Sequence, residues 1–128
     1  MIRLVRDSIT HINADAICYG AKDNGEMGGG AAAAIVLADG PQVISDAKRV
    51  ITPNSRVGDV FYSEAHLLSD KLGVKCIIHL ISIIKYTPQG SYCPKPENIR
   101  SGVMNALTLA KKLGCQSIAF SAMGTGNS

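Results

Sequence analysis

The sequence has 128 residues, of which 46% are hydrophobic and only 5% aromatic, and its formal net charge is +3. This length and hydrophobicity exclude a disordered chain and indicate one domain with a single aliphatic core. The scarcity of aromatic rings disfavours a base-stacking platform, and the small charge argues against DNA or RNA as a partner while suiting a small anionic ligand.

The N-terminal residues do not resemble a targeting signal, and the cysteines do not have the spacing of a metal site. Residues 1–7 are too few and too charged for a signal peptide, and no apolar run approaches the roughly 20 residues that cross a membrane. None of the four cysteines forms a C-x-x-C pair, and Cys18 and Cys76 lie in apolar runs typical of buried strands. We therefore expect a cytoplasmic protein with neither a metal site nor a cofactor.

The predicted elements of the first half alternate between strands and helices. Residues 2–5 alternate apolar and basic side chains, as a half-exposed edge strand does, and residues 15–21 form the first inner strand. The pattern then predicts helices at 30–38 and 41–50, a strand at 58–65 and a short helix or turn at 66–73.

The second half continues this alternation. Residues 76–84 are nearly all apolar, as in a strand that is covered on both faces. A long loop with three prolines is predicted at 85–96, an amphipathic helix at 97–113 and a last strand at 116–122. This order predicts an α/β fold with a mostly parallel sheet, in which ligands bind at the carboxyl ends of the strands.

Two glycine-rich segments follow predicted strands. Residues 28–30 are three consecutive glycines before an alanine run, and residues 124–126 read Gly-Thr-Gly after the last strand. Glycine allows the backbone to approach a ligand closely, and a helix N-terminus offers free N–H groups to an anion. Two such loops on one sheet edge favour a phosphate-containing ligand over simple turns, although neither is a Walker A or a Rossmann fingerprint.

The histidines point to structural roles. His79 lies within the most apolar strand, so we expect a hydrogen-bonded core histidine and not a general base. His11 falls in a predicted turn, and His66 begins a polar helix. No spacing in the sequence supports a zinc site or a Ser–His–Asp triad.

The whole pattern resembles the macro domain family, which binds ADP-ribose and in some members hydrolyses its derivatives. Four blocks carry the likeness: residues 15–17 with 28–35, residues 58–60, residues 77–79, and residues 117–126. The resemblance implies one domain over residues 1–128, with a three-layer α/β/α fold and a mixed, mostly parallel sheet. The resemblance also implies further helices and at least one more strand after this point, so either the sequence is truncated or a sheet edge is left open, and an open edge would favour a homodimer.

The resemblance also implies which residues bind the ligand. The first diphosphate loop corresponds to Gly28, Gly29, Gly30 and Ala31. The second, around the phosphates and the distal ribose, corresponds to Ala122, Met123, Gly124, Thr125 and Gly126. The family's adenine-binding aspartate falls at Ser8, beside Ile9, with Asp7 one residue early.

Several catalytic positions of the family differ here. The asparagine that reaches the distal ribose is replaced by Lys22, which accepts no hydrogen bond when charged, and the acidic residue after the glycines is replaced by Ala32. These differences predict an ADP-ribose-binding module with weak or no hydrolase activity. Two alternatives stay open: a hydrolase or ADP-ribose-1''-phosphate phosphatase that uses Lys22, Asp23 or Asn24, and a protein with a decayed site that acts as an oligomer.

Overall fold

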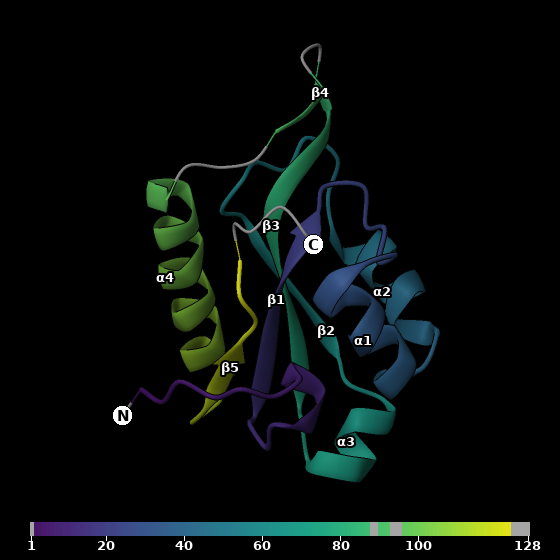
Figure 1. The fold of residues 1–128 in the computed structure, drawn as a ribbon, viewed down its shortest axis with the longest axis vertical. Coiled ribbons are helices and arrows are strands. Elements are labelled where there is room, and N and C mark those ends of the chain that lie inside the picture. Colours follow the sequence, from purple (N-terminus) through teal and green to yellow (C-terminus); the bar gives the residue numbers. More distant parts are fainter. Residues whose placement is uncertain (1, 88–89, 93–95, 124–128) are drawn as a thin grey trace.

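The computed structural model describes residues 2–87, 90–92 and 96–123, which form one twisted sheet between two layers of helices (Figure 1). The strands are β1 (Ala16–Lys22), β2 (Val60–Glu64), β3 (Cys76–Thr87), β4 (Gly90–Tyr92) and β5 (Ile118–Phe120). Their order is β2-β3-β1-β5, and β4 pairs with β3 off this path. β1 is parallel to β3 and β5, whereas β2 and β4 are antiparallel to β3. The predicted mixed sheet is therefore confirmed, with a parallel centre.

Helices cover both faces of this sheet. On one side lie α1 (Gly30–Asp39), α2 (Gln42–Val50) and α3 (Leu67–Leu72), and on the other lies α4 (Pro96–Lys112) (Figure 1). A short 3-10 helix, η1 (Ile9–His11), precedes β1. This arrangement confirms the three-layer α/β/α fold. Within the described ranges no helix is long and apolar enough to span a bilayer.

The two central strands are buried on both faces, which explains their continuous apolar sequence. Ile17 of β1 lies opposite Ile77 of β3, and both belong to the core cluster beneath α1 to α3. Cys18 lies opposite Ile78, and both belong to the cluster beneath α4. Each fully buried isoleucine contributes about 1.5–3 kcal/mol of burial free energy.

The helix α4 approaches the sheet closely at Gly102. A Cβ added there would lie 2.8 Å from Leu80 Cδ2 and 3.2 Å from the Cα of Gly58. The Asn105 side-chain amide also donates to the Gly58 carbonyl at 3.0 Å. A side chain at position 102 would therefore push α4 away from β3 and the loop before β2.

Three of the predicted boundaries were wrong. Residues 2–5 form no strand, and Ile2 and Leu4 are fully exposed because no neighbouring strand pairs with them. The loop predicted at 85–96 contains a hairpin instead, since β3 continues to Thr87, just before Pro88, and β4 pairs back onto it. The last strand is shorter than 116–122 and covers only Ile118–Phe120.

Candidate functional site

The strand β1 ends in a tight turn that holds the three sequence-predicted catalytic candidates. The Asp23 N–H donates to the Ile83 carbonyl at 3.0 Å, which continues the pairing of β1 with β3 beyond Lys22. Asn24 Oδ1 accepts the Glu26 N–H at 3.0 Å. Lys22, Asp23 and Asn24 therefore lie together at the carboxyl end of β1, and the Asn24 carbonyl oxygen already serves the turn.

The segment between this turn and the glycines is held by contacts with α2 and with the core. Gly25 has φ +76°, and a Cβ there would lie 3.0 Å from Lys48 Cγ on α2, so this position requires the closeness that glycine permits. Met27 is buried in the core cluster beneath α1. These two contacts hold the chain just before the glycines and set where α1 begins.

The N-terminus of α1 has no side-chain cap among the residues that the structure describes. Gly29 is the N-cap residue and makes no side-chain cap bond, and the first turn contains no acidic residue. The first helical bond runs from the Ala33 N–H to the Gly29 carbonyl at 3.3 Å, so the N–H groups of residues 30–32 precede the ladder. A Cβ at Gly28 would meet no atom of residues 2–87, 90–92 and 96–123 within 4 Å, and Gly30 has φ +58°. Free N–H groups at the positive end of a helix dipole form an anion site.

The second predicted loop is described only at its start. The Ser121 N–H donates to the Cys18 carbonyl at 3.0 Å, so the chain leaves β5 alongside β1. Ala122 is exposed, and Met123 packs against the core cluster beneath α4. Gly124, Thr125 and Gly126 lie outside the described residues. The predicted partnership of the two loops therefore stays a prediction.

The residues predicted to bind adenine form a self-contained turn. Asp7 Oδ1 accepts the Ser8 N–H and contacts His11 Nδ1, both at 2.7 Å, and the hydrogen bond with His11 lowers the pKa of Asp7. Ser8 Oγ accepts the Thr10 N–H at 3.2 Å and so caps η1. Ile9 is buried in the core.

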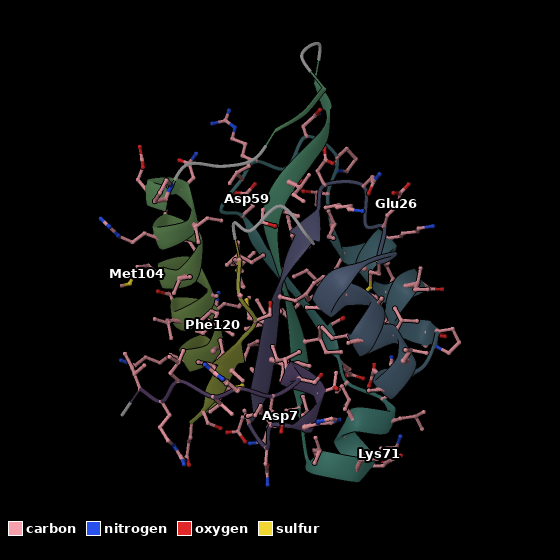
Figure 2. All side chains as sticks on the ribbon, in the orientation of Figure 1. Asp7, Glu26, Asp59, Lys71, Met104 and Phe120 are labelled. Carbon is pink, nitrogen blue, oxygen red and sulfur yellow. The ribbon has the colours of Figure 1, made fainter. Side chains whose placement is uncertain are left out.

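This turn lies far from the glycines. A shallow cavity joins Thr10 and His11 of η1 to Ala38, near the C-terminal end of α1. The glycines lie at the other end of this helix, roughly 15 Å away for ten residues at ~1.5 Å per residue. In Figure 2, Asp7 lies near the lower end of the molecule, and Glu26 lies well above it on the side of α1 and α2. The structure thus brings Lys22 to Asn24 near the glycine loop but leaves residues 7–9 apart from it.

A groove of about 720 Å³, which the sequence did not predict, runs along the outer edge of β2. Its walls come from the strand itself, from α2 and from α4. Its polar lining includes Asp46, Ser63 and His66. Asp46 and His66 are twenty positions apart in different helical segments, so no local spacing signals their contact. No group of three or more potential ligands for a metal ion occurs in the part of the chain that the structure describes.

An ion pair closes one end of this groove. His66 Nε2 lies 2.7 Å from Asp46 Oδ2, and Gln42 Nε2 donates to the other carboxylate oxygen at 3.3 Å. The hydrogen bond with Asp46 raises the pKa of His66. Burial opposes ionisation of Asp46, but the hydrogen bonds from His66 and Gln42 outweigh it and lower the pKa of that carboxyl. Both shifts favour the charged forms of the two groups, and the contact anchors the start of α3 to α2.

A second polar contact is fully enclosed. The Tyr19 hydroxyl lies 2.6 Å from His79 Nδ1, and Ser63 Oγ lies 2.8 Å from His79 Nε2. His79 has no exposed surface, and burial lowers its pKa to about 4. Both ring nitrogens thus have partners, as expected for a neutral core histidine.

Fold and loop together define a three-layer α/β/α protein with an uncapped, glycine-rich helix N-terminus at the carboxyl end of its central strand. Comparison with protein families matches residues 19–128 to the macro domain. The chain therefore belongs to the macro domain family.

Individual relatives agree with this assignment. An uncharacterized protein of Pyrobaculum aerophilum is 34% identical over 96% of this chain, and the O-acetyl-ADP-ribose deacetylase of Cronobacter turicensis is 30% identical over 98% of it. The Trypanosoma brucei macrodomain in complex with ADP-ribose superposes with a TM-score of 0.74 at 25% identity, over 94% of this chain.

These proteins are longer than the present chain. The chain spans 63% of the Pyrobaculum protein, 68% of the Cronobacter deacetylase and 46% of the Trypanosoma chain. In an uncharacterized protein of Thermotoga maritima it corresponds to only 20% of the length. The similarity to these proteins therefore covers the macro domain and only part of each full-length chain.

Proposed function

We propose that the protein binds ADP-ribose, or a related nucleotide diphosphate, with its diphosphate on the backbone N–H groups at the start of α1. The observation that carries this proposal is the uncapped helix N-terminus beside Gly28, where an added Cβ would meet no atom of the described residues within 4 Å. Its support also includes the Trypanosoma brucei macrodomain, whose structure contains ADP-ribose. Residues 122–126 complete the phosphate site in this proposal.

Calorimetric titration with ADP-ribose tests this proposal, with ADP and AMP as controls. We expect micromolar binding of ADP-ribose and much weaker binding of AMP, because AMP lacks the diphosphate. In Gly28→Glu the added carboxylate should lower the affinity by about tenfold or more through repulsion. Because a Cβ at this position meets no described atom within 4 Å, the fold should not change.

Leu37→Glu is the matched control for this experiment. Leu37 is 85% exposed and belongs to the same helix, so the variant adds the same charge far from the glycines. We expect its affinity to equal that of the wild type. Equal losses in both variants would refute a site at the start of α1.

The base contact at residues 7–9 is a separate part of the proposal. If Asp7 or Ser8 binds adenine, Asp7→Ala should weaken ADP-ribose but leave ribose 5-phosphate unchanged. Because η1 lies beside the C-terminal end of α1, such a ligand has to extend along this helix. Unchanged ADP-ribose affinity in Asp7→Ala would restrict the site to the phosphates and ribose.

We propose binding with weak or no turnover as the main activity, since Lys22 and Ala32 replace polar residues of hydrolytic members. Ester hydrolysis is the second candidate, supported by the relative named O-acetyl-ADP-ribose deacetylase. Saturable release of acetate from O-acetyl-ADP-ribose, lost in Lys22→Ala, would establish it. A monomer–dimer measurement together with an absence of ligand binding would instead favour the oligomeric alternative. A cytoplasmic location is a further prediction, which fits the free cysteines.

A further inference from the structure

Two cysteines from distant parts of the sequence meet at the amino end of the sheet. Cys76 begins β3 and Cys115 follows α4, yet their sulfur atoms lie only 3.9 Å apart. Cys76 is 6% exposed, whereas Cys115 is partly exposed. Both are free thiols in this structure. The pair therefore has one accessible sulfur and one enclosed sulfur in contact.

Asp15 holds the backbone on both sides of this contact. Its carbonyl accepts the N–H groups of Lys75 and Cys76 at 2.7 and 3.3 Å. Its carboxylate accepts the Gln116 N–H, and its own N–H donates to Ser117 Oγ, both at 2.8 Å. One residue thus ties the start of β3 to the segment that carries the second cysteine. The proximity of the sulfurs follows from four hydrogen bonds and not from a chance approach of two side chains.

We propose that Cys76 and Cys115 are a thiol–disulfide pair, a modification site that is oxidised by a low-molecular-weight disulfide. This inference goes beyond ligand binding and does not rest on it, because the pair lies at the opposite end of β1 from the glycine loop. Bond formation requires the sulfurs to approach from 3.9 Å to about 2.05 Å. Rotation of the two side chains about their Cα–Cβ bonds has to supply this movement, because hydrogen bonds hold the backbone on both sides.

The exchange proceeds in two balanced steps. The thiolate of Cys115 attacks one sulfur of the small disulfide, which forms a mixed disulfide and releases one thiolate. Cys76 then loses its proton and attacks Cys115 Sγ, which forms the protein disulfide and releases the second thiolate. The two cysteine protons end on the two released thiols, so two cysteines are oxidised and one small disulfide is reduced. Burial raises the pKa of Cys76, so the second step is the slow one.

The bond would stabilise the protein by tying β3 to the end of α4. It closes a loop between positions 76 and 115 and so restricts the unfolded chain. We expect the melting temperature to rise on the order of 5–10 °C after oxidation and to return on reduction. The glycine loop lies outside this closed segment, so ADP-ribose affinity should not depend on it.

The test treats the whole chain with glutathione disulfide and counts alkylated thiols in denaturant by mass spectrometry. Of the four cysteines, two should become protected without added mass, and digestion should yield a linked peptide pair containing positions 76 and 115. Cys93→Ser is the control and should keep this bond. Cys115→Ser, at the partly exposed position, should lose both the bond and the rise in melting temperature.

Two results would overturn the proposal. One is a wild type that gains only glutathione adducts and no internal bond. The other is an internal bond that persists in Cys115→Ser, which would assign it to other cysteines. Cys76→Ser is a second variant that should also lose the bond. If a serine at this buried position impairs folding, Cys115→Ser still decides the test.

Discussion

The two ends of α1 differ in how their backbone and side-chain groups are satisfied. At the N-terminal end the glycines expose N–H groups, and no side chain caps the helix. At the C-terminal end Asp39 is 1% exposed, and its Oδ1 accepts the N–H groups of His66 and Leu68 at 2.7 and 3.1 Å. The N-terminal end thus has no side-chain cap among the described residues, whereas at the C-terminal end a carboxylate accepts N–H groups at the start of α3.

This difference separates positions that maintain the fold from positions that are free to bind. A buried acceptor such as Asp39 is costly to remove, because its N–H partners lose their hydrogen bonds away from water. An exposed glycine such as Gly28 contributes little to folding, because a side chain placed there would meet no atom of the described residues within 4 Å. Substitutions at the two ends should therefore change different measured quantities.

The largest expected effect is on folding at the C-terminal end of α1. Asp39→Ala removes the acceptor of two backbone N–H groups and should lower the free energy of unfolding by about 3–4 kcal/mol. Urea denaturation measures this loss. Asp70→Ala, an exposed aspartate on α3, is the control and should change stability by less than about 0.5 kcal/mol. Similar values for both variants would contradict a capping role for Asp39.

The enclosed histidine should produce the next largest effect, through pH. Burial lowers the pKa of His79 to about 4, so between this value and its ordinary 6.5 the unfolded chain binds the extra proton. The His79 contribution to stability is thus present above pH 6.5 and is lost as the pH falls, by about 2 kcal/mol between pH 7 and pH 5. Unfolding curves across this range should show this slope, and His79→Gln should reduce it. An equal slope in the variant would assign the effect to other groups.

The ion pair at the groove should give a smaller effect of the opposite sign. Because the hydrogen bond with Asp46 raises the pKa of His66, its contribution is fully present below pH 6.5 and is lost as the pH rises through the folded pKa. We expect the melting temperature to fall slightly above pH 6.5 in the wild type. The same decline should be absent in both His66→Gln and Asp46→Asn. A decline that persists in both variants would exclude this pair as its source.

The smallest effect on stability is expected at the glycine loop. Gly28→Ala adds a methyl group that meets no atom of the described residues within 4 Å, so the free energy of unfolding should stay within about 0.5 kcal/mol of the wild type. Gly102→Ala is the contrasting variant, because its Cβ would lie 2.8 Å from Leu80 and should destabilise the protein by about 1–3 kcal/mol. Thermal unfolding compares the two. Equal losses would show that the start of α1 is part of the packed structure.

Sequence patterns were sufficient for the layers of the fold and for the start of α1. Continuous apolar runs located β1 and β3, and the glycine–alanine sequence located the beginning of the helix. Edge strands were harder to predict, because whether a segment forms a strand depends on a neighbouring strand to pair with. Residues 2–5 have a strand pattern but form no strand, and β4 lies where prolines predicted a loop. The contact of Asp46 with His66 depends on how α2 packs beside β2, and no spacing along the chain encodes it.

The site residues show the same limit. Lys22, Asp23 and Asn24 follow a strand that could be predicted, so their position at its carboxyl end was predictable too. Residues 7–9 were placed by resemblance alone, and their turn is determined by local hydrogen bonds and by packing at the far end of α1.

The most direct test of ligand binding at α1 follows backbone amide signals by NMR while ADP-ribose is added to the isotopically labelled protein. The account predicts the largest shifts at residues 28–32, where N–H groups face the ligand, and no comparable shifts at Asp46 or His66. In Gly28→Glu the amide signals of these residues should not shift when ADP-ribose is added. Shifts confined to the groove beside β2, or none at any concentration, would contradict a diphosphate site at the start of this helix.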